Sequence, residues 1–173
     1  MDKTIDQLKK LKVVCLYEKK KHFNAATRKS KYNLWIGIPL ISFTVVSSSV
    51  LLYAIVSNAS GWVKYVPLAL SFVSAFLSSI QTFFNFSKQI EGHKSIGNRY
   101  LAAMKECELF YAFYQDKQLT DIDFKDKVLE LYNKVQQVNK DSEAYSTNQN
   151  DYRKTKEGID LGEEKYTRKE LSM

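Results

Sequence analysis

The chain has 173 residues and a net charge of +7, a length that allows one domain or a membrane hairpin with one soluble module. Two runs without any charged residue, residues 34–57 and 66–86, hold much of its apolar content. The remaining residues are too polar to cover two all-round apolar helices, which favours a membrane protein over a soluble α-domain with two buried helices. Two cysteines, both predicted to lie in cytoplasmic segments, exclude a disulfide framework.

The N-terminal arm, residues 1–33, carries nearly all of the excess positive charge, with ten Lys or Arg against three Asp or Glu. Residues 3–31 contain no Pro or Gly, and their apolar positions recur every three or four residues, which predicts a basic amphipathic helix. Its basic face is open to three interpretations: a solvated surface, an anchor on anionic lipid, or a nucleotide or nucleic-acid site. Aromatic side chains for base stacking are few there, so we expect no direct nucleic-acid binding.

The two apolar runs are 24 and 21 residues long, or roughly 36 and 32 Å as helices, against a hydrocarbon core of about 30 Å. Because only helices or closed barrels satisfy the backbone in lipid, the pair predicts a transmembrane helical hairpin across residues 34–86. The base-poor loop 58–65 is expected outside, with both termini in the cytoplasm. The predicted lipid-interface anchors are Arg28, Lys29, Lys31, Tyr32 and Trp35 at one end, and Trp62 and Tyr65 at the other.

The second run carries a polar seam whose members are spaced alternately by three and four residues, which places them on one face of a helix. The face is costly in hydrocarbon unless it meets protein or water. Two interpretations stay open, helix–helix packing and the lining of a pore. The seam consists of Ser71, Ser74, Ser78, Gln81, Asn85 and Lys88.

Residues 87–146 predict a prolongation of the second span and a second helix, together a cytoplasmic helical hairpin. The fold class is therefore an all-α membrane protein, a two-span transmembrane helical hairpin that continues into a cytoplasmic helical bundle. Residues 147–173 are polar and predict a flexible tail with Ile159 and Leu161 as its only candidate anchors. The predicted bundle or oligomer seam is Tyr100, Met104, Cys107, Tyr111, Phe124, Val128, Leu131 and Val135.

The residues that carry most enzyme chemistry are scarce and scattered. His22 and His93 have no close partner at metal-ligand spacing, and there is no Gly-rich phosphate loop. Cys15 and Cys107 are expected to face the bundle as small apolar residues rather than to react. We therefore expect no enzyme activity, no catalytic residue, no metal and no cofactor.

Four stretches together resemble the SLATT family of two-span effector domains in prokaryotic conflict systems. They are residues 22–26 (HFNAA), 33–39 (NLWIGIP), 79–86 (SIQTFFNF) and 93–100 (HKSIGNRY). The resemblance covers residues 6–145. It implies an oligomerising effector of the cell inner membrane that permeabilises or disrupts that membrane on infection. It also implies a partner system built on a nucleotide-synthesising enzyme or a reverse transcriptase, and functional roles for Ser74, Ser78, Gln81 and Asn85.

Two functional hypotheses follow from these patterns. The first is a non-enzymatic, homo-oligomeric effector of antiviral defence that inserts in the lipid bilayer and permeabilises it, leading to abortive infection. The second is a membrane-anchored coiled-coil interaction module that docks a soluble partner and forms no pore. The polar seam and the resemblance favour the first.

Overall fold

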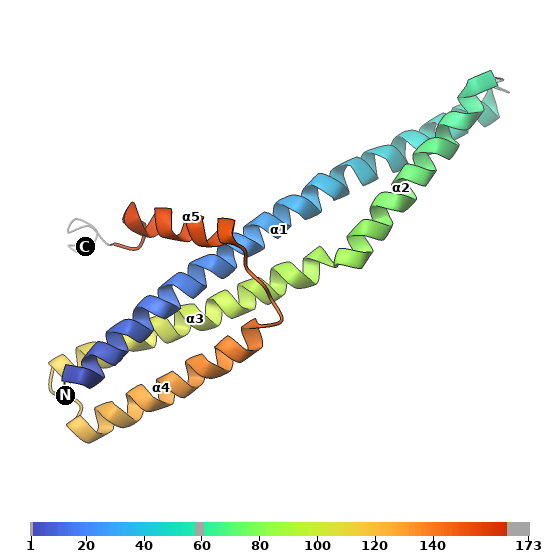
Figure 1. Cartoon of the computed structure of the whole chain (residues 1–173). Coiled ribbons are helices and arrows are strands. Elements are labelled where there is room, and N and C mark those ends of the chain that lie inside the picture. The colour runs from blue at the N-terminus through green and yellow to red at the C-terminus, as the bar shows by residue number, and fades with distance from the viewer. Residues whose placement is uncertain (1, 58–60, 166–173) are drawn as a thin grey trace. The chain divides into compact units, whose positions relative to one another are not determined.

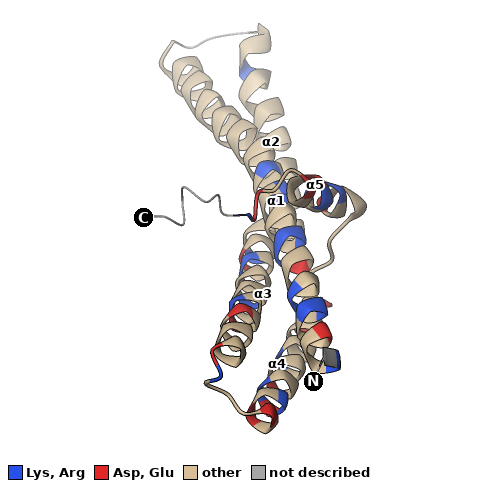
Figure 2. Cartoon of the chain, turned by 90° about the vertical axis from the view of Figure 1, so that its left-hand side faces the viewer, with Lys and Arg blue, Asp and Glu red and all other residues tan. Residues whose placement is uncertain are grey.

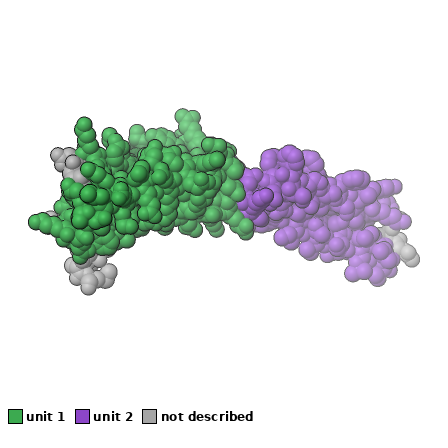
Figure 3. Space-filling model, turned by 90° about the horizontal axis from the view of Figure 1, so that it is seen from below, with its two compact units in different colours: residues 1–26, 91–173 green, residues 27–90 purple. Residues whose placement is uncertain are grey.

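The computed structural model describes residues 2–57 and 61–165, and these contain helices but no strand (Figure 1). The first three residues of the expected loop and the last eight of the expected tail lie outside that range. The chain divides into two compact units, residues 27–90 and residues 1–26 with 91–173 (Figure 3). The helices are α1 (Asp2–Val56), the short 3₁₀ helix η1 (Gly61–Lys64), α2 (Tyr65–Phe84), α3 (Phe86–Gln115), α4 (Asp121–Ser142) and α5 (Gln149–Asp160).

The unit of residues 27–90 contains the second half of α1 together with η1 and α2. Two helical stretches, Lys3–Val56 and Gly61–Gln115, are long and apolar enough to cross a membrane. In the most apolar 18-residue segment of each stretch, only 6% of the segment is buried. A core helix of a soluble protein would be mostly buried. α2 carries no charged residue (Figure 2). Pro67 is its third residue, where the missing N–H costs no helical hydrogen bond.

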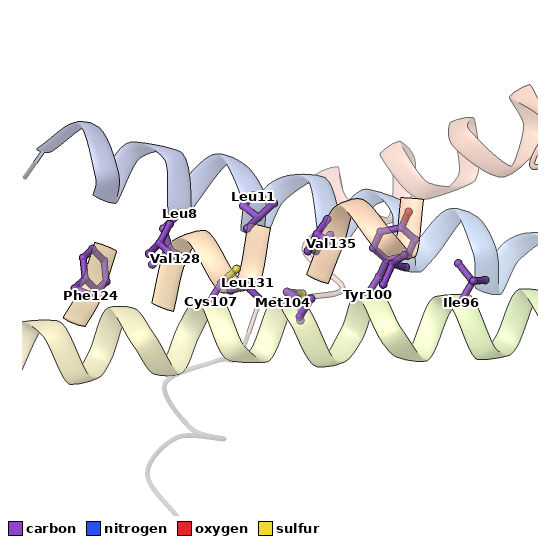
Figure 4. Packing of buried hydrophobic residues seen from close by; sticks show 13 residues of the cluster. Leu8, Leu11, Ile96, Tyr100, Met104, Cys107, Phe124, Val128, Leu131 and Val135 are labelled. Carbon is purple, nitrogen blue, oxygen red and sulfur yellow. The ribbon is translucent and has the colours of Figure 1, made fainter. Parts of the chain in front are cut away.

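The other unit is a bundle in which the first half of α1, α3 and α4 share one apolar core (Figure 4). In each helix the buried residues recur every three or four positions, so one stripe of each helix faces the core. Its fully buried side chains include Leu8, Tyr100, Phe124 and Leu131. The core comprises Leu8, Leu11, Cys15, Ile96, Tyr100, Ala103, Met104, Cys107, Phe124, Val128, Leu131, Val135 and Val138.

Helix α5 occupies residues for which the sequence predicted a flexible tail. Its N-terminus is closed by a reciprocal capping box between Asn148 and Asp151. The Asn24 side-chain amide of α1 donates to the Asp151 carbonyl (3.2 Å) and to the Thr155 hydroxyl (3.1 Å). The expected anchor Leu161 is 83% exposed. α5 therefore docks through polar contacts, which an apolar pattern does not reveal.

Part of the basic face of α1 is engaged by the segment that follows α5. The Lys19 ammonium pairs with the Glu164 carboxylate at 2.9 Å, and the Lys20 ammonium pairs with Glu163 at 2.6 Å. Lys19 is only 6% exposed, so this cation lies within the bundle rather than on a solvated surface. A buried ammonium needs such a partner to offset its lost hydration.

Close packing at Gly92 yields a stability prediction. A Cβ there would lie 1.9 Å from the Tyr145 ring, whereas a Cβ at Gly37, also inside a helix, would meet its nearest neighbour, the Gln81 amide, at 3.7 Å. We expect Gly92→Ala to lower the free energy of unfolding by about 1–3 kcal/mol, because the ring must move. Gly37→Ala should be neutral or raise it by up to about 1 kcal/mol, because alanine favours a helix. Unfolding in detergent, followed by far-UV circular dichroism, measures both; equal effects would contradict the packing.

Candidate functional site in the membrane hairpin

The part of the polar seam around Ser71 faces the first span of the same chain. Ser47 of α1 is 7% exposed, and its hydroxyl donates to the Pro67 carbonyl at 3.0 Å. The Ser71 hydroxyl lies 3.1 Å from the same Ser47 oxygen. Because a hydroxyl has one proton, Ser47 donates to the carbonyl and accepts from Ser71. This pair joins the two spans by side-chain hydrogen bonds inside the apolar region.

The part of the seam around Gln81 makes a second link between the spans. The Gln81 side-chain amide of α2 donates to the Asn33 side-chain carbonyl of α1 at 2.8 Å. Gly37 lies one helical turn after Asn33, and a Cβ there would be 3.7 Å from the Gln81 amide nitrogen, which places Gly37 beside Gln81 in the same interface. Between the two links, the Ser74 hydroxyl is buried and has no hydrogen-bond partner within the described residues. The structure thus brings Ser71, Ser74 and Gln81 into the hairpin interface.

The other seam residues are not brought into that interface. Ser78 and Lys88 are exposed, as is Asn85, which lies where α2 and α3 meet. Most other exposed hydroxyls of the spans are satisfied within their own helix, because each donates to the carbonyl four residues earlier. This holds for Ser42, Thr44, Ser48, Ser49 and Ser79. Ser78 makes no hydrogen bond within the described part of the chain, unlike the adjacent Ser79, and the exposed Thr82 one turn further along α2 makes none either.

The sequence predicted one unbroken helix through the end of the second span, whereas the structure breaks it at Asn85. Asn85 is left-handed (φ 43°, ψ 55°), a conformation that asparagine tolerates better than other side-chain-bearing residues. Its side-chain carbonyl accepts from the Lys88 backbone N–H at 3.3 Å. The Gln89 amide donates to the Phe84 carbonyl at 2.6 Å, while its oxygen accepts from Lys29. These contacts replace the helical hydrogen bonds that the break removes.

The predicted lipid-interface anchors differ in exposure. Trp35 is 78% exposed and Trp62 is 75% exposed, as expected of side chains that meet lipid headgroups. Lys31, Tyr32 and Tyr65 are exposed as well. The two remaining anchors are partly covered: Arg28 lies over the Tyr32 ring at 5.9 Å, and Lys29 donates to Gln89.

The predicted bundle or oligomer seam lies within the core of a single chain. Tyr111 is partly buried against that core, and the other seven residues belong to it. Cys15 and Cys107 are both in the core, where burial raises the pKa of their thiols to about 12 and about 11. Both thiols therefore favour the protonated form at neutral pH.

His22 and His93, 71 residues apart in the sequence, face each other inside the bundle. Their Nδ1 atoms are 3.1 Å apart, and the two residues are 2% and 0% exposed. In the neutral pair one Nδ1 donates and the other accepts. Burial, followed by the nearby Lys21 charge, lowers the pKa of His22 to about 4, against a smaller opposite effect of Asp151. Among residues 2–57 and 61–165, no group of three metal-ligating side chains surrounds the pair.

Comparison with known protein families decides the identity of this hairpin. The model of the SMODS and SLOG-associating 2TM effector domain family 4 (SLATT_4) matches residues 5–170. The chain belongs to the SLATT family. No curated protein and no solved structure matches it.

The family assignment confirms the resemblance that the sequence indicated, and with it the fold class. This SLATT chain is an all-α membrane protein with two spans, and its family supports the role of a membrane effector in conflict systems. The match extends past residue 145 and includes α5, so the last helix belongs to the family domain.

The sequence analysis missed the partners of the seam on the first span. Asn33, Gly37 and Ser47, with Leu40 and the exposed Thr44 between them, follow the same three- and four-residue spacing as the seam on α2. This second pattern was the signal that would have located the interface. No comparable signal marked Asn24 and Thr155, which are brought together by the docking of α5.

The left-handed conformation of Asn85 leads to a prediction about the break. Asn85→Gly should leave stability nearly unchanged, because glycine adopts positive φ freely. Asn85→Val should lower the free energy of unfolding by at least about 1–2 kcal/mol, or convert the break to continuous helix, because a β-branched residue is strained there. Amide hydrogen exchange at residues 85–89 in detergent distinguishes these outcomes. Indistinguishable behaviour of the two variants would argue against a left-handed Asn85.

The buried histidine pair predicts loss of stability in acid. Unfolded His22 titrates near pH 6.5 and folded His22 near 4, so the unfolded state binds more protons between these values. The free energy of unfolding should therefore fall as pH drops from about 6.5 to 4, by up to about 3 kcal/mol. Thermal unfolding across that range measures it. His22→Gln should flatten the slope; an unchanged slope in this variant would assign the pH dependence to other groups.

Proposed function

We propose that this SLATT chain is a membrane effector of prokaryotic antiviral defence that oligomerises in the inner membrane and permeabilises it when triggered. The family supports the effector role in conflict systems, and the two apolar helices support residence in the bilayer. Pore formation and self-association are the finer part of the proposal. They are supported by the distribution of polar groups over the hairpin.

The observation that carries the proposal is the split of the polar seam. Ser71 and Gln81 bond to the first span, whereas Ser78 is exposed and lacks a hydrogen bond within the described chain. An unsatisfied hydroxyl on a lipid-exposed surface costs free energy. Water in a pore or a polar group of a second copy removes this cost. A packing role for Ser71 and Gln81 and a pore or oligomer role for Ser78 are therefore compatible.

The proposed topology follows the distribution of bases. Arg28, Lys29 and Lys31 precede the first span, and Lys64 is the one base between the spans. Because cytoplasmic flanks are enriched in bases, we place both termini in the cytoplasm. The bundle then lies where a partner, such as a nucleotide-synthesising enzyme or a reverse transcriptase, delivers the trigger. The proposed action is physical rather than enzymatic.

Two adjacent serines provide a matched test. Ser79 is exposed like Ser78, but its hydroxyl already donates to the Ala75 carbonyl at 2.8 Å. We expect Ser78→Leu to reduce the entry of a membrane-impermeant dye into bacteria that overproduce the chain to near the level of uninduced cells. Ser79→Leu should leave dye entry close to that of the parent chain, because the Ser79 hydroxyl is already hydrogen-bonded within its own helix.

Membrane flotation of both variants provides the control for insertion. Loss of dye entry with retained insertion in Ser78→Leu alone supports the proposal. Undiminished dye entry in Ser78→Leu, or equal loss in both variants, would contradict a pore or oligomer role for this face.

An apolar groove keeps the interaction module as the alternative. Between α1 and α4 lies a cavity of about 190 Å³ whose lining includes Val14, 45% exposed, and Tyr132, 49% exposed. A soluble partner that docks there would make the bundle, and not the seam, the functional part. Ser78→Leu would then change nothing. The predicted seam residues Leu131 and Val135 are each 1% exposed, so charging them would disrupt the core rather than release a partner.

A further inference from the structure

An apolar pocket lies on α1 at the N-terminal end of the first span, next to the basic residues 28, 29 and 31. Its volume is about 370 Å³, and it is lined by Lys31, Leu34, Trp35, Ile38 and Pro39. Counted from Lys31, these residues occupy positions i, i+3, i+4, i+7 and i+8, so they share one face of the helix. Asn33 and Gly37, which meet Gln81 of α2, lie on a different face. The pocket therefore opens away from α2, toward lipid.

Lys31 at the head of this pocket differs from the two bases beside it. Arg28 lies over the Tyr32 ring, and Lys29 donates to Gln89. Lys31 is exposed, and no hydrogen bond or ion pair engages it within the described residues. The pocket thus combines an unpaired ammonium at one end with an apolar lining of Leu34, Ile38 and Pro39.

The geometry points to one bound anionic phospholipid, which we propose as the occupant, with its phosphate on Lys31 and an acyl chain along Ile38 and Pro39. From Lys31 to Pro39 the helix rises about 12 Å, enough for a headgroup and the upper half of an acyl chain. Trp35 forms one wall, the position in which an indole meets both headgroup and chain. The inference rests on membrane insertion, and not on permeabilisation.

Charge complementarity favours the lipid over a second copy of this chain. A second apolar span in the pocket would bury the Lys31 ammonium without a counter-charge, which is costly in hydrocarbon. A phosphate supplies that charge, whereas a zwitterionic lipid brings a cation of its own. One base at a membrane surface contributes about a five-fold enrichment of an anionic lipid, equivalent to about 1 kcal/mol.

The two tryptophans of the chain allow the site to be tested without an added label. The full-length Trp62→Phe variant, in which Trp35 is the only tryptophan, is reconstituted in phosphatidylcholine vesicles. These contain a minor fraction of either brominated phosphatidylglycerol or brominated phosphatidylcholine, whose bromines quench nearby indoles. We expect Trp35 to be quenched more strongly by the anionic lipid, to the extent of a roughly five-fold local enrichment.

Trp62 provides the matched control. It is 75% exposed and lies two residues from the exposed base Lys64, and neither residue is among those that line the pocket at Lys31. In the full-length Trp35→Phe variant, the preference of Trp62 for the anionic lipid should therefore be weaker than that of Trp35, because Lys64 attracts anionic lipid only as a surface base. An equal preference for the anionic lipid at both tryptophans would show diffuse attraction to bases, and it would overturn the proposal.

Two charge-matched variants locate the headgroup. Lys31→Gln should abolish the preference of Trp35 for the anionic lipid, whereas Arg28→Gln, one turn away and outside the pocket, should retain it. Equal quenching by both lipids in the parent, or equal loss in both variants, contradicts a site at Lys31. Protection of Trp35 from both lipids while Trp62 is quenched would show a second copy in the pocket. Absence of quenching at either tryptophan would overturn insertion itself, and with it the proposed function.

Discussion

In a bilayer an unsatisfied polar group of a span costs free energy, and this constraint explains how the two spans of the hairpin are joined. Ser47 and Ser71 satisfy each other near one end of the spans, and Asn33 and Gln81 do so near the other. Most exposed serines and threonines of the spans use the carbonyl four residues earlier. Within the described residues, Ser78 and Thr82, one turn apart on α2, are exposed and make no hydrogen bond, and the proposed function centres on Ser78 because it belongs to the polar seam.

Sequence patterns predicted the parts of the fold that depend on apolar burial or on charge. The uncharged runs, residues 34–57 and 66–86, are almost entirely helical in the hairpin unit, where the spans end at Val56 and at Phe84. Their length matches the bilayer. The apolar spacing in residues 87–146 matches the stripes that form the bundle core. The polar seam on α2 was visible in the sequence, but its division between interface and exposed face depends on how α1 packs, which spacing alone does not specify.

Features that depend on single polar contacts escaped prediction. Asn85 breaks the helix by adopting a left-handed conformation, and the sequence around it shows no proline or glycine to announce this. α5 docks through Asn24 and Thr155, in a segment whose composition is typical of a flexible tail. His22 and His93 are distant in sequence, and only the packing of α1 on α3 brings their rings together. Each of these depends on tertiary geometry rather than on local pattern.

The central claim is that side-chain hydrogen bonds between the spans hold the hairpin together. A double-mutant cycle on Asn33→Leu and Gln81→Leu, measured by reversible unfolding in bicelles, tests it most directly. The account predicts a favourable coupling of about 0.6–1.7 kcal/mol between these two side chains, the range found for hydrogen bonds between membrane helices. Strictly additive effects of the two substitutions would show that the side chains do not interact, and would contradict the account.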